Sequence, residues 1–253
     1  MSMDDARGFI DNPRPAGGAD RISRVLLGVN EPDGIIAGGS VPTDPAQYAR
    51  LWVDVVDTAR QNGYVKMAGP QLAAGGTSPP DTDHPHGQGR YWMNTFLEEL
   101  DAELDRRISS GSTLNKGDYL HYLSYHVYEP NCQLDANFLI EWQLRFVMDV
   151  WDREFREVYN ARGFKIEGYA ITEIACAPWS GGADRAGQEK MAGPVLEGML
   201  ADERLRMVAW FSARSYGGDW HNGAHYLWDE NTGVFSSVGE MYARSCREAP
   251  ALM

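Results

Sequence analysis

Five short apolar segments, separated by longer stretches with helical periodicity, constrain the fold of this chain more than any other feature. Each is bounded by turn residues such as glycine or proline and has the length of a strand. Strands that alternate with helices form parallel sheets, because parallel neighbours need a crossover connection. The sequence therefore predicts an α/β fold with strands at 24–29, 64–68, within 119–128, 168–174 and 207–211.

The segments between these strands carry helix signals. Thr43 or Asp44 can cap the first helix, Pro45 suits its first turn, and Gly63 can end it. Residues 69–90 are rich in glycine, proline, serine and histidine and predict a long loop. Further helices are expected at 92–108, 138–161, 191–200, where Pro194 kinks or starts the helix, and around 238–245.

Length and charge limit the classes of function. A chain of 253 residues suits one TIM barrel, so residues 1–253 are interpreted as a single domain. The formal net charge of −13 argues against nucleic acids and anionic membranes as partners, and we expect a monomer. Neither a secretory signal nor an apolar run near the ~18 residues of a membrane span is visible.

Cysteines and histidines predict no cofactor or metal site. Cys132 and Cys176 follow neighbouring predicted strands and can form a disulfide in an oxidising compartment, but reduced thiols remain an equal alternative. The spacing of His221 and His225 would suit zinc on a helix, and Gly223 disfavours a helix there. No glycine-rich nucleotide-binding motif is present, so we expect no cofactor.

Two glutamates stand at the ends of predicted parallel strands. Glu31, within Asn-Glu-Pro-Asp at 30–33, follows the first strand, and Glu173 closes the fourth. Ligands of parallel α/β sheets and barrels bind at the carboxyl ends of the strands. Glycoside hydrolysis generally uses two carboxyl groups on either side of the scissile bond. Taken singly, either glutamate is more commonly a solvated loop residue, but the pair indicates a glycosidase.

A family resemblance makes this hypothesis specific. Leu-Leu-Gly-Val-Asn-Glu-Pro-Asp at 26–33 resembles the acid/base motif of the retaining glycoside hydrolase clan that shares a TIM barrel. Further motifs are similar, in order, to glycoside hydrolase family 128, the β-1,3-glucanases: Met-Ala-Gly-Pro at 67–70, Ser-Tyr-His-Val-Tyr at 124–128, Ala-Ile-Thr-Glu-Ile-Ala-Cys at 170–176 and Ala-Trp-Phe at 209–211.

The resemblance implies a retaining endo-β-1,3-glucanase on a TIM (β/α)8 barrel. The family has three strands before Asn-Glu-Pro, whereas only residues 7–10 resemble one here. The expected barrel is thus either complete or short of about two early strands. The family also implies secretion, although this chain shows no signal peptide, and a β-glucan polysaccharide as the partner.

The resemblance assigns a role to each candidate site residue. Glu31 is the expected general acid/base and Glu173 the expected nucleophile. Binding roles are expected for Asn30 at the sugar 2-hydroxyl, His126 and Tyr128 along the cleft with Tyr128 donating to Glu173, Trp210 as a stacking floor, and Trp179 as a further subsite wall. For the histidine, the tyrosine and the tryptophans, burial in the core is the competing interpretation.

Two alternatives stay open. One is another retaining glycosidase of the same clan with a different β-glucan as substrate. The other is a glucan-binding protein without activity, a relic of such an enzyme, which the missing early strands would favour. For a retaining enzyme, the two carboxyl groups are expected about 5–5.5 Å apart.

Overall fold

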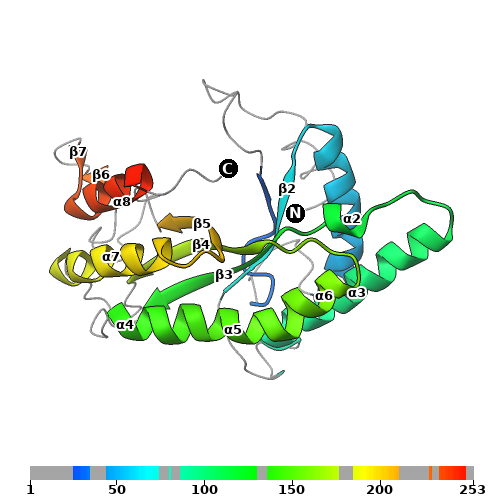
Figure 1. Ribbon diagram of the computed structural model, residues 1–253, viewed down its shortest axis with the longest axis horizontal. Coiled ribbons are helices and arrows are strands. Elements are labelled where there is room, and N and C mark those ends of the chain that lie inside the picture. Colours follow the sequence, from blue (N-terminus) through cyan, green and yellow to red (C-terminus); the bar gives the residue numbers. More distant parts are fainter. Residues whose placement is uncertain are drawn as a thin grey trace. The chain divides into compact units, whose positions relative to one another are not determined.

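A computed structural model describes residues 25–34, 44–73, 80, 86–129, 136–176, 185–210, 228–229 and 234–248. Within them, a five-stranded sheet has the order β1-β2-β3-β4-β5 (Figure 1). Its strands are β1 (Val25–Leu27), β2 (Lys66–Leu72), β3 (Tyr122–Glu129), β4 (Gly168–Cys176) and β5 (Leu205–Trp210). The pairs β1–β2, β2–β3 and β4–β5 are parallel, so the predicted α/β class and its five strands are confirmed.

Helices occupy the connections, as the periodicity predicts. They are α2 (Pro45–Gln61), α3 (Arg90–Ser109), the short 3₁₀ turn η1 (Lys116–Asp118), α7 (Arg185–Leu200) and α8 (Ser237–Glu248). Between β3 and β4, one helical run changes between α and π geometry: α4 (Ala136–Phe138), η2 (Leu139–Phe146), α5 (Val147–Trp151), η3 (Asp152–Arg156) and α6 (Glu157–Ala161). Two short antiparallel strands, β6 (Trp228–Asp229) and β7 (Val234–Phe235), precede α8.

The chain forms two compact units. The first comprises Met1–Tyr125 and Val150–Gly168, and the second comprises His126–Asp149 and Tyr169–Met253. Strand β3 belongs partly to each unit. The expected single domain and the complete barrel stay predictions, and the strand expected at 7–10 lies outside the described residues. Among the residues described, no helix is both long and apolar enough to cross a membrane.

The core of the first unit is aromatic. Helices α2 and α3 pack side by side (Figure 1) through Tyr48, Trp52, Trp92 and Phe96, whose ring centroids lie 5.6–6.0 Å apart. Asp44 caps α2 by accepting hydrogen bonds from the Ala46 and Gln47 backbones, which settles the choice between the two predicted caps. The Trp52 indole donates to the Tyr119 carbonyl at 2.9 Å, so the helix pair is tied to the chain entering β3.

In the second unit, α7 packs against α8 and against the η2 stretch. The Tyr242 hydroxyl of α8 donates to the Val208 carbonyl of β5 at 3.0 Å. The Tyr169 hydroxyl at the start of β4 donates to the Met148 carbonyl of α5 at 3.0 Å. These bonds join the outer helices to the β4–β5 pair.

Two predicted boundaries are wrong by four residues or more. Residues 69–72, expected in a loop, extend β2 to Leu72, because Gln71 and Leu72 pair with Ser124 and Tyr125 of β3. The helix expected from Met191 begins at Arg185, with Pro194 inside it. Residues 185–190 include strong helix formers, and burial of Val195, Leu196 and Met199 supports the helix beyond the proline.

Gly28 sets how closely β1 can approach β2. A Cβ at this position would lie 2.6 Å from the Gly69 carbonyl carbon and 2.8 Å from the Pro70 nitrogen, both of which are backbone atoms that cannot turn aside. We predict that Gly28→Ala lowers the free energy of unfolding by about 2–3 kcal/mol. Urea denaturation measures the change.

Gly193→Ala is the matched control, because a Cβ added at this position of helix α7 would meet nothing within 4 Å. In that helical setting alanine should be neutral or stabilising by about 0.5–1 kcal/mol. Equal effects of the two substitutions would contradict the close approach of β1 and β2.

Candidate active site

Glu31 is held in an uncommon backbone conformation at the end of the first strand. It is half-buried, and its φ of 46° lies in the left-handed region that non-glycine residues seldom adopt. Its backbone N–H donates to the Gln71 carbonyl at 2.7 Å, and its own carbonyl accepts from Gly34 at 3.2 Å. Such a conformation persists only where the surroundings enforce it.

Gln71, next to Pro70 in β2, helps to hold the backbone that leads into Glu31. The Gly28 N–H donates to the Ala68 carbonyl at 3.0 Å, and in a regular parallel ladder residue 70 would return a bond to the Gly28 carbonyl. Proline has no N–H, and the Gln71 side-chain amide donates to that carbonyl instead, at 2.5 Å. The ladder then resumes through the Gln71 backbone, whose N–H donates to the Val29 carbonyl.

Asp33 fixes the other end of the turn. It is 5% exposed, and its carboxylate accepts from the Ala73 N–H at 2.9 Å and the Gly89 N–H at 3.1 Å. Burial raises the pKa of Asp33, while these backbone donors act in the opposite direction. Asp33 thus connects the turn that contains Glu31 to the chain after β2 and to the start of α3.

Glu173 of β4 belongs to a cluster of side chains in the second unit. Its Oε2 accepts a short hydrogen bond from the Tyr128 hydroxyl, and the Nδ1 atom of His126 lies 3.5 Å from the same oxygen. The His126 side chain is fully buried and that of Glu173 is 20% exposed. His126 and Tyr128 are two apart on β3, so they share one face of the strand, and their rings meet edge to face at 6.2 Å.

The structure says less about the roles of the remaining predicted site residues. Asn30 is exposed and pairs with Gln71 through an isolated parallel bridge. Trp210 ends β5 opposite Ile174 and is only 6% exposed. Trp179 and Cys132 lie outside the described residues. The roles of all these residues, the proposed disulfide and the separation between the Glu31 and Glu173 carboxyl groups stay predictions.

Sequence reasoning missed two residues that support the Glu31 turn. Gln71 falls in the predicted loop, although Pro70 next to a predicted parallel strand signals a missing donor that a nearby side chain must replace. Asp33 stands out in the sequence only as part of a motif. An acidic residue two positions after a strand-end glutamate can accept from neighbouring loops, but nothing in the sequence identifies Ala73 and Gly89 as the donors.

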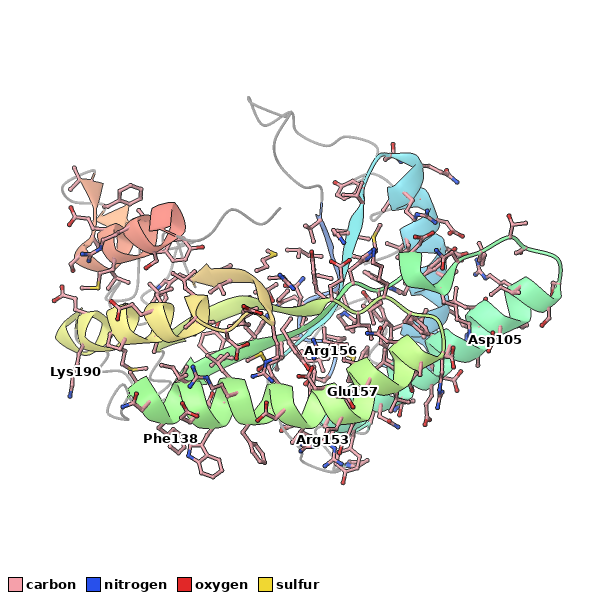
Figure 2. All side chains as sticks on the ribbon, in the orientation of Figure 1. Asp105, Phe138, Arg153, Arg156, Glu157 and Lys190 are labelled. Atoms are coloured by element: carbon pink, nitrogen blue, oxygen red, sulfur yellow. The ribbon has the colours of Figure 1, made fainter. Side chains whose placement is uncertain are left out.

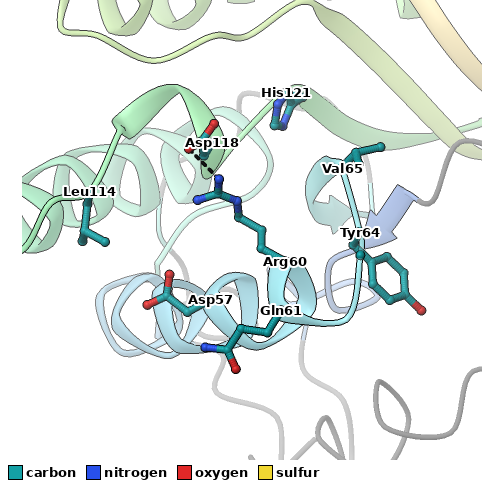
Figure 3. A pocket seen from close by; sticks show the side chains of 9 residues that line it. Asp57, Arg60, Gln61, Tyr64, Val65, Leu114, Asp118 and His121 are labelled. Carbon is teal, nitrogen blue, oxygen red and sulfur yellow. Dashed lines mark ion pairs between the residues drawn. The ribbon is translucent and has the colours of Figure 1, made fainter.

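A cavity of about 660 Å³ lies at the opposite edge of the first unit's strands, where β2 and β3 begin (Figure 3). Arg60 and Asp118 form an ion pair there at 2.8 Å, and His121 lines the wall. None of the predicted site residues lines this cavity. Because parallel sheets bind their ligands at the carboxyl ends of strands, we do not assign the candidate site to it.

The sequence matches the family described as glycosyl hydrolase catalytic core over residues 4–242. The chain belongs to this family. No curated protein sequence gives a significant match. Because the match covers nearly the whole chain, it supports a hydrolase class independently of any one motif.

Solved structures of glycoside hydrolase family 128 share the fold. An endo-β-1,3-glucanase (subgroup II) from Sorangium cellulosum has a TM-score of 0.60 at 20% identity, over 100% of this chain and 78% of its own. An oligosaccharide-binding protein (subgroup VII) from Trichoderma gamsii has a TM-score of 0.55 at 15% identity, over 89% and 68%.

A third structure is a variant endo-β-1,3-glucanase (subgroup I) from Amycolatopsis mediterranei in complex with laminarihexaose. Its TM-score is 0.53 at 17% identity, over 90% of this chain and 73% of its own. Together with the family match, these structures confirm the resemblance to glycoside hydrolase family 128. At these identities the structural likeness concerns the fold, and the activity of this chain needs a separate argument.

Asp33→Ala should loosen the turn that holds Glu31. The substitution leaves the buried Gly89 N–H and the Ala73 N–H without their acceptor, so we predict a loss of about 2 kcal/mol in the free energy of unfolding. Hydrogen exchange at Ala73 and Gly89 should become faster.

Asp54→Ala is the control, since Asp54 makes an ion pair with Arg107 at 2.8 Å while its side chain is 49% exposed. Such surface pairs contribute about 0–1 kcal/mol. Unchanged exchange at Ala73 and Gly89 in Asp33→Ala would refute the role of this carboxylate.

His121 should make stability depend on pH. Its Nδ1 accepts from the Met67 N–H at 3.2 Å, and burial lowers its pKa to about 4, with the Lys66 charge acting in the same direction. The unfolded histidine titrates near pH 6.5. Between these values the unfolded state binds the extra proton, so the free energy of unfolding should fall by about 2 kcal/mol as the pH drops from 7 to 4.5.

His121→Gln cannot titrate in this range and should lose this contribution, while every carboxylate titrates in both proteins. Urea denaturation at the two pH values measures the difference. If both proteins lost the same free energy of unfolding on acidification, the buried neutral His121 would be excluded as the cause.

Proposed function

We propose that this chain hydrolyses β-1,3-glucosidic bonds inside a glucan with retention of anomeric configuration. Family membership supports a glycoside hydrolase, and the β-1,3-glucanases among the structural relatives support the substrate class. The proposal includes a TIM-type barrel with Glu31 and Glu173 at the carboxyl ends of its strands. No cofactor enters the reaction.

The proposed chemistry is a double displacement. Glu173 attacks the anomeric carbon while Glu31 gives its proton to the departing glycosidic oxygen, which leaves a covalent glycosyl-enzyme and a shortened glucan. A water molecule then attacks the same carbon, Glu31 takes a proton from that water, and Glu173 leaves as a carboxylate. The separation of about 5–5.5 Å expected for the two carboxyl groups follows from this order of events.

The observation that carries the proposal is the environment of Glu173. A carboxylate that acts as a nucleophile must keep one oxygen directed at the anomeric carbon. Tyr128 and His126 both approach Oε2, from one face of a single strand. In the proposed reaction they fix the orientation of the carboxylate, and Oε1 is the oxygen that attacks.

Oligosaccharide binding without hydrolysis is the second candidate. The Trichoderma gamsii protein of the same family is an oligosaccharide-binding protein and shares the fold at a TM-score of 0.55. The two candidates differ in turnover rather than in ligand. Calorimetry with laminarihexaose, combined with an assay for new reducing ends, separates them.

Glu173→Gln tests the proposed nucleophile. Release of reducing ends from a linear β-1,3-glucan should fall by at least about 10³-fold, because the amide cannot form the glycosyl-enzyme. Glu157→Gln is the control, since Glu157 is an exposed glutamate of α6. Early products of the unsubstituted protein, followed by ¹H NMR, should keep the β configuration.

The outcomes separate the candidates. A first product with inverted anomeric configuration would refute the retaining mechanism, but the protein would still be a hydrolase. If the unsubstituted protein bound laminarihexaose without hydrolysing it, the second candidate function, oligosaccharide binding, would replace the first. A protein that neither binds nor cleaves any β-glucan would overturn both.

A further inference from the structure

Three aromatic side chains form an exposed row on the helix that follows β3. Phe138, Trp142 and Phe146 are 40%, 56% and 50% exposed and stand four residues apart. Trp142 and Phe146 have ring centroids 5.6 Å apart, at an interplanar angle of 48°. We call these three side chains the aromatic ridge. Phe138 lies on the side of the helix turned away from α7 (Figure 2).

The opposite side of the same helix already has its packing partner. Leu139, Ile140 and Leu144 are buried, and the helix contacts α7. The contact is close, because a Cβ on Gly198 of α7 would lie 2.5 Å from the Ile140 side chain. The aromatic ridge is therefore not the core-facing side of this helix.

The backbone beneath the ridge is unusual. Residues Leu139–Phe146 form a π-helix of eight residues, longer than the single-turn bulges in which this geometry mostly occurs. Single π turns are frequent at functional sites. Two of the three ridge residues, Trp142 and Phe146, lie in this π stretch.

Neither a second copy of this chain nor a membrane suits the aromatic ridge as its binding partner. Three half-exposed aromatics offer an area on the order of 300 Å², whereas a specific protein interface takes ~800 Å² from each partner. Two chains with a net charge of −13 each also repel one another, as do such a chain and an anionic bilayer. Surface-bound amphipathic helices instead carry lysine and arginine around their apolar face.

A neutral linear polymer fits this narrow strip. The C–H faces of sugar rings pack on aromatic rings, and the 5.6 Å between neighbouring centroids is comparable with the width of one pyranose ring. Beside Trp142, Glu141 and Arg145 form an ion pair at 2.5 Å with partly exposed side chains, which offer hydrogen bonds to hydroxyl groups. A neutral ligand meets no repulsion from the acidic protein.

We propose that the aromatic ridge binds a β-glucan chain as a second site, separate from the residues assigned to hydrolysis. The choice of ligand rests on the proposed function. The ridge holds particulate glucan against the protein, and its loss affects insoluble substrate while short soluble substrate is cleaved as before.

The test uses the full chain and the triple variant F138A/W142A/F146A. Its binding to insoluble β-1,3-glucan particles, measured by depletion from solution, should weaken roughly tenfold. Hydrolysis of the particles should slow, while kcat/KM for a soluble laminari-oligosaccharide should stay unchanged. Tyr91→Ala and Phe235→Ala are matched controls, since these aromatics are 44% and 50% exposed on other elements.

Each outcome bears on one proposal. If the triple variant and the unsubstituted protein bound the particles equally and still cleaved soluble oligosaccharide, only the proposed role of the aromatic ridge would be overturned. A dimer in analytical ultracentrifugation that dissociates in the triple variant would identify a second copy as the occupant. Binding to anionic vesicles that the triple variant loses would identify a membrane. Failure of the unsubstituted protein to bind or cleave any β-glucan would instead overturn the proposed function.

Discussion

The Gln71 side chain keeps the ladder between β1 and β2 intact up to the turn in which Glu31 lies. A regular parallel ladder would need an N–H at position 70 for the Gly28 carbonyl, but residue 70 is proline, and the Gln71 side-chain amide donates instead. The backbone of Gln71 then continues the pairing in the same register, through bonds to Val29 and Glu31. The chain leaves the sheet at Glu31 with a positive φ, and Asp33 ties the end of the turn to two other segments.

The two glutamates are held by different means. Glu31 is positioned through its backbone, by hydrogen bonds and by close contact between Gly28 and its neighbours in β2. Glu173 is positioned through its side chain, by Tyr128 and His126. The support of Glu173 suits its proposed role, because a nucleophile needs one fixed line of attack.

The sequence is most informative where a pattern repeats and least informative where one residue compensates for another. The five strands and the cap at Asp44 follow from apolar runs and from local hydrogen bonding, both of which depend on neighbours in the chain. The Tyr128–Glu173 bond is expected from the family motif. The role of Gln71 depends on the register of a distant strand. The π geometry of Leu139–Phe146 has no counterpart in its composition, which is ordinary for an α-helix.

The fold alone does not distinguish a hydrolase from a binding protein, because both kinds occur among its structural relatives. A carboxylate that only binds sugar can accept hydroxyl groups in many orientations and needs little support. Two side chains that converge on one oxygen of Glu173, one of them a fully buried imidazole, restrict that orientation at a cost in desolvation. Such restriction has a physical use when the other oxygen must form a bond, as it does in the proposed hydrolysis.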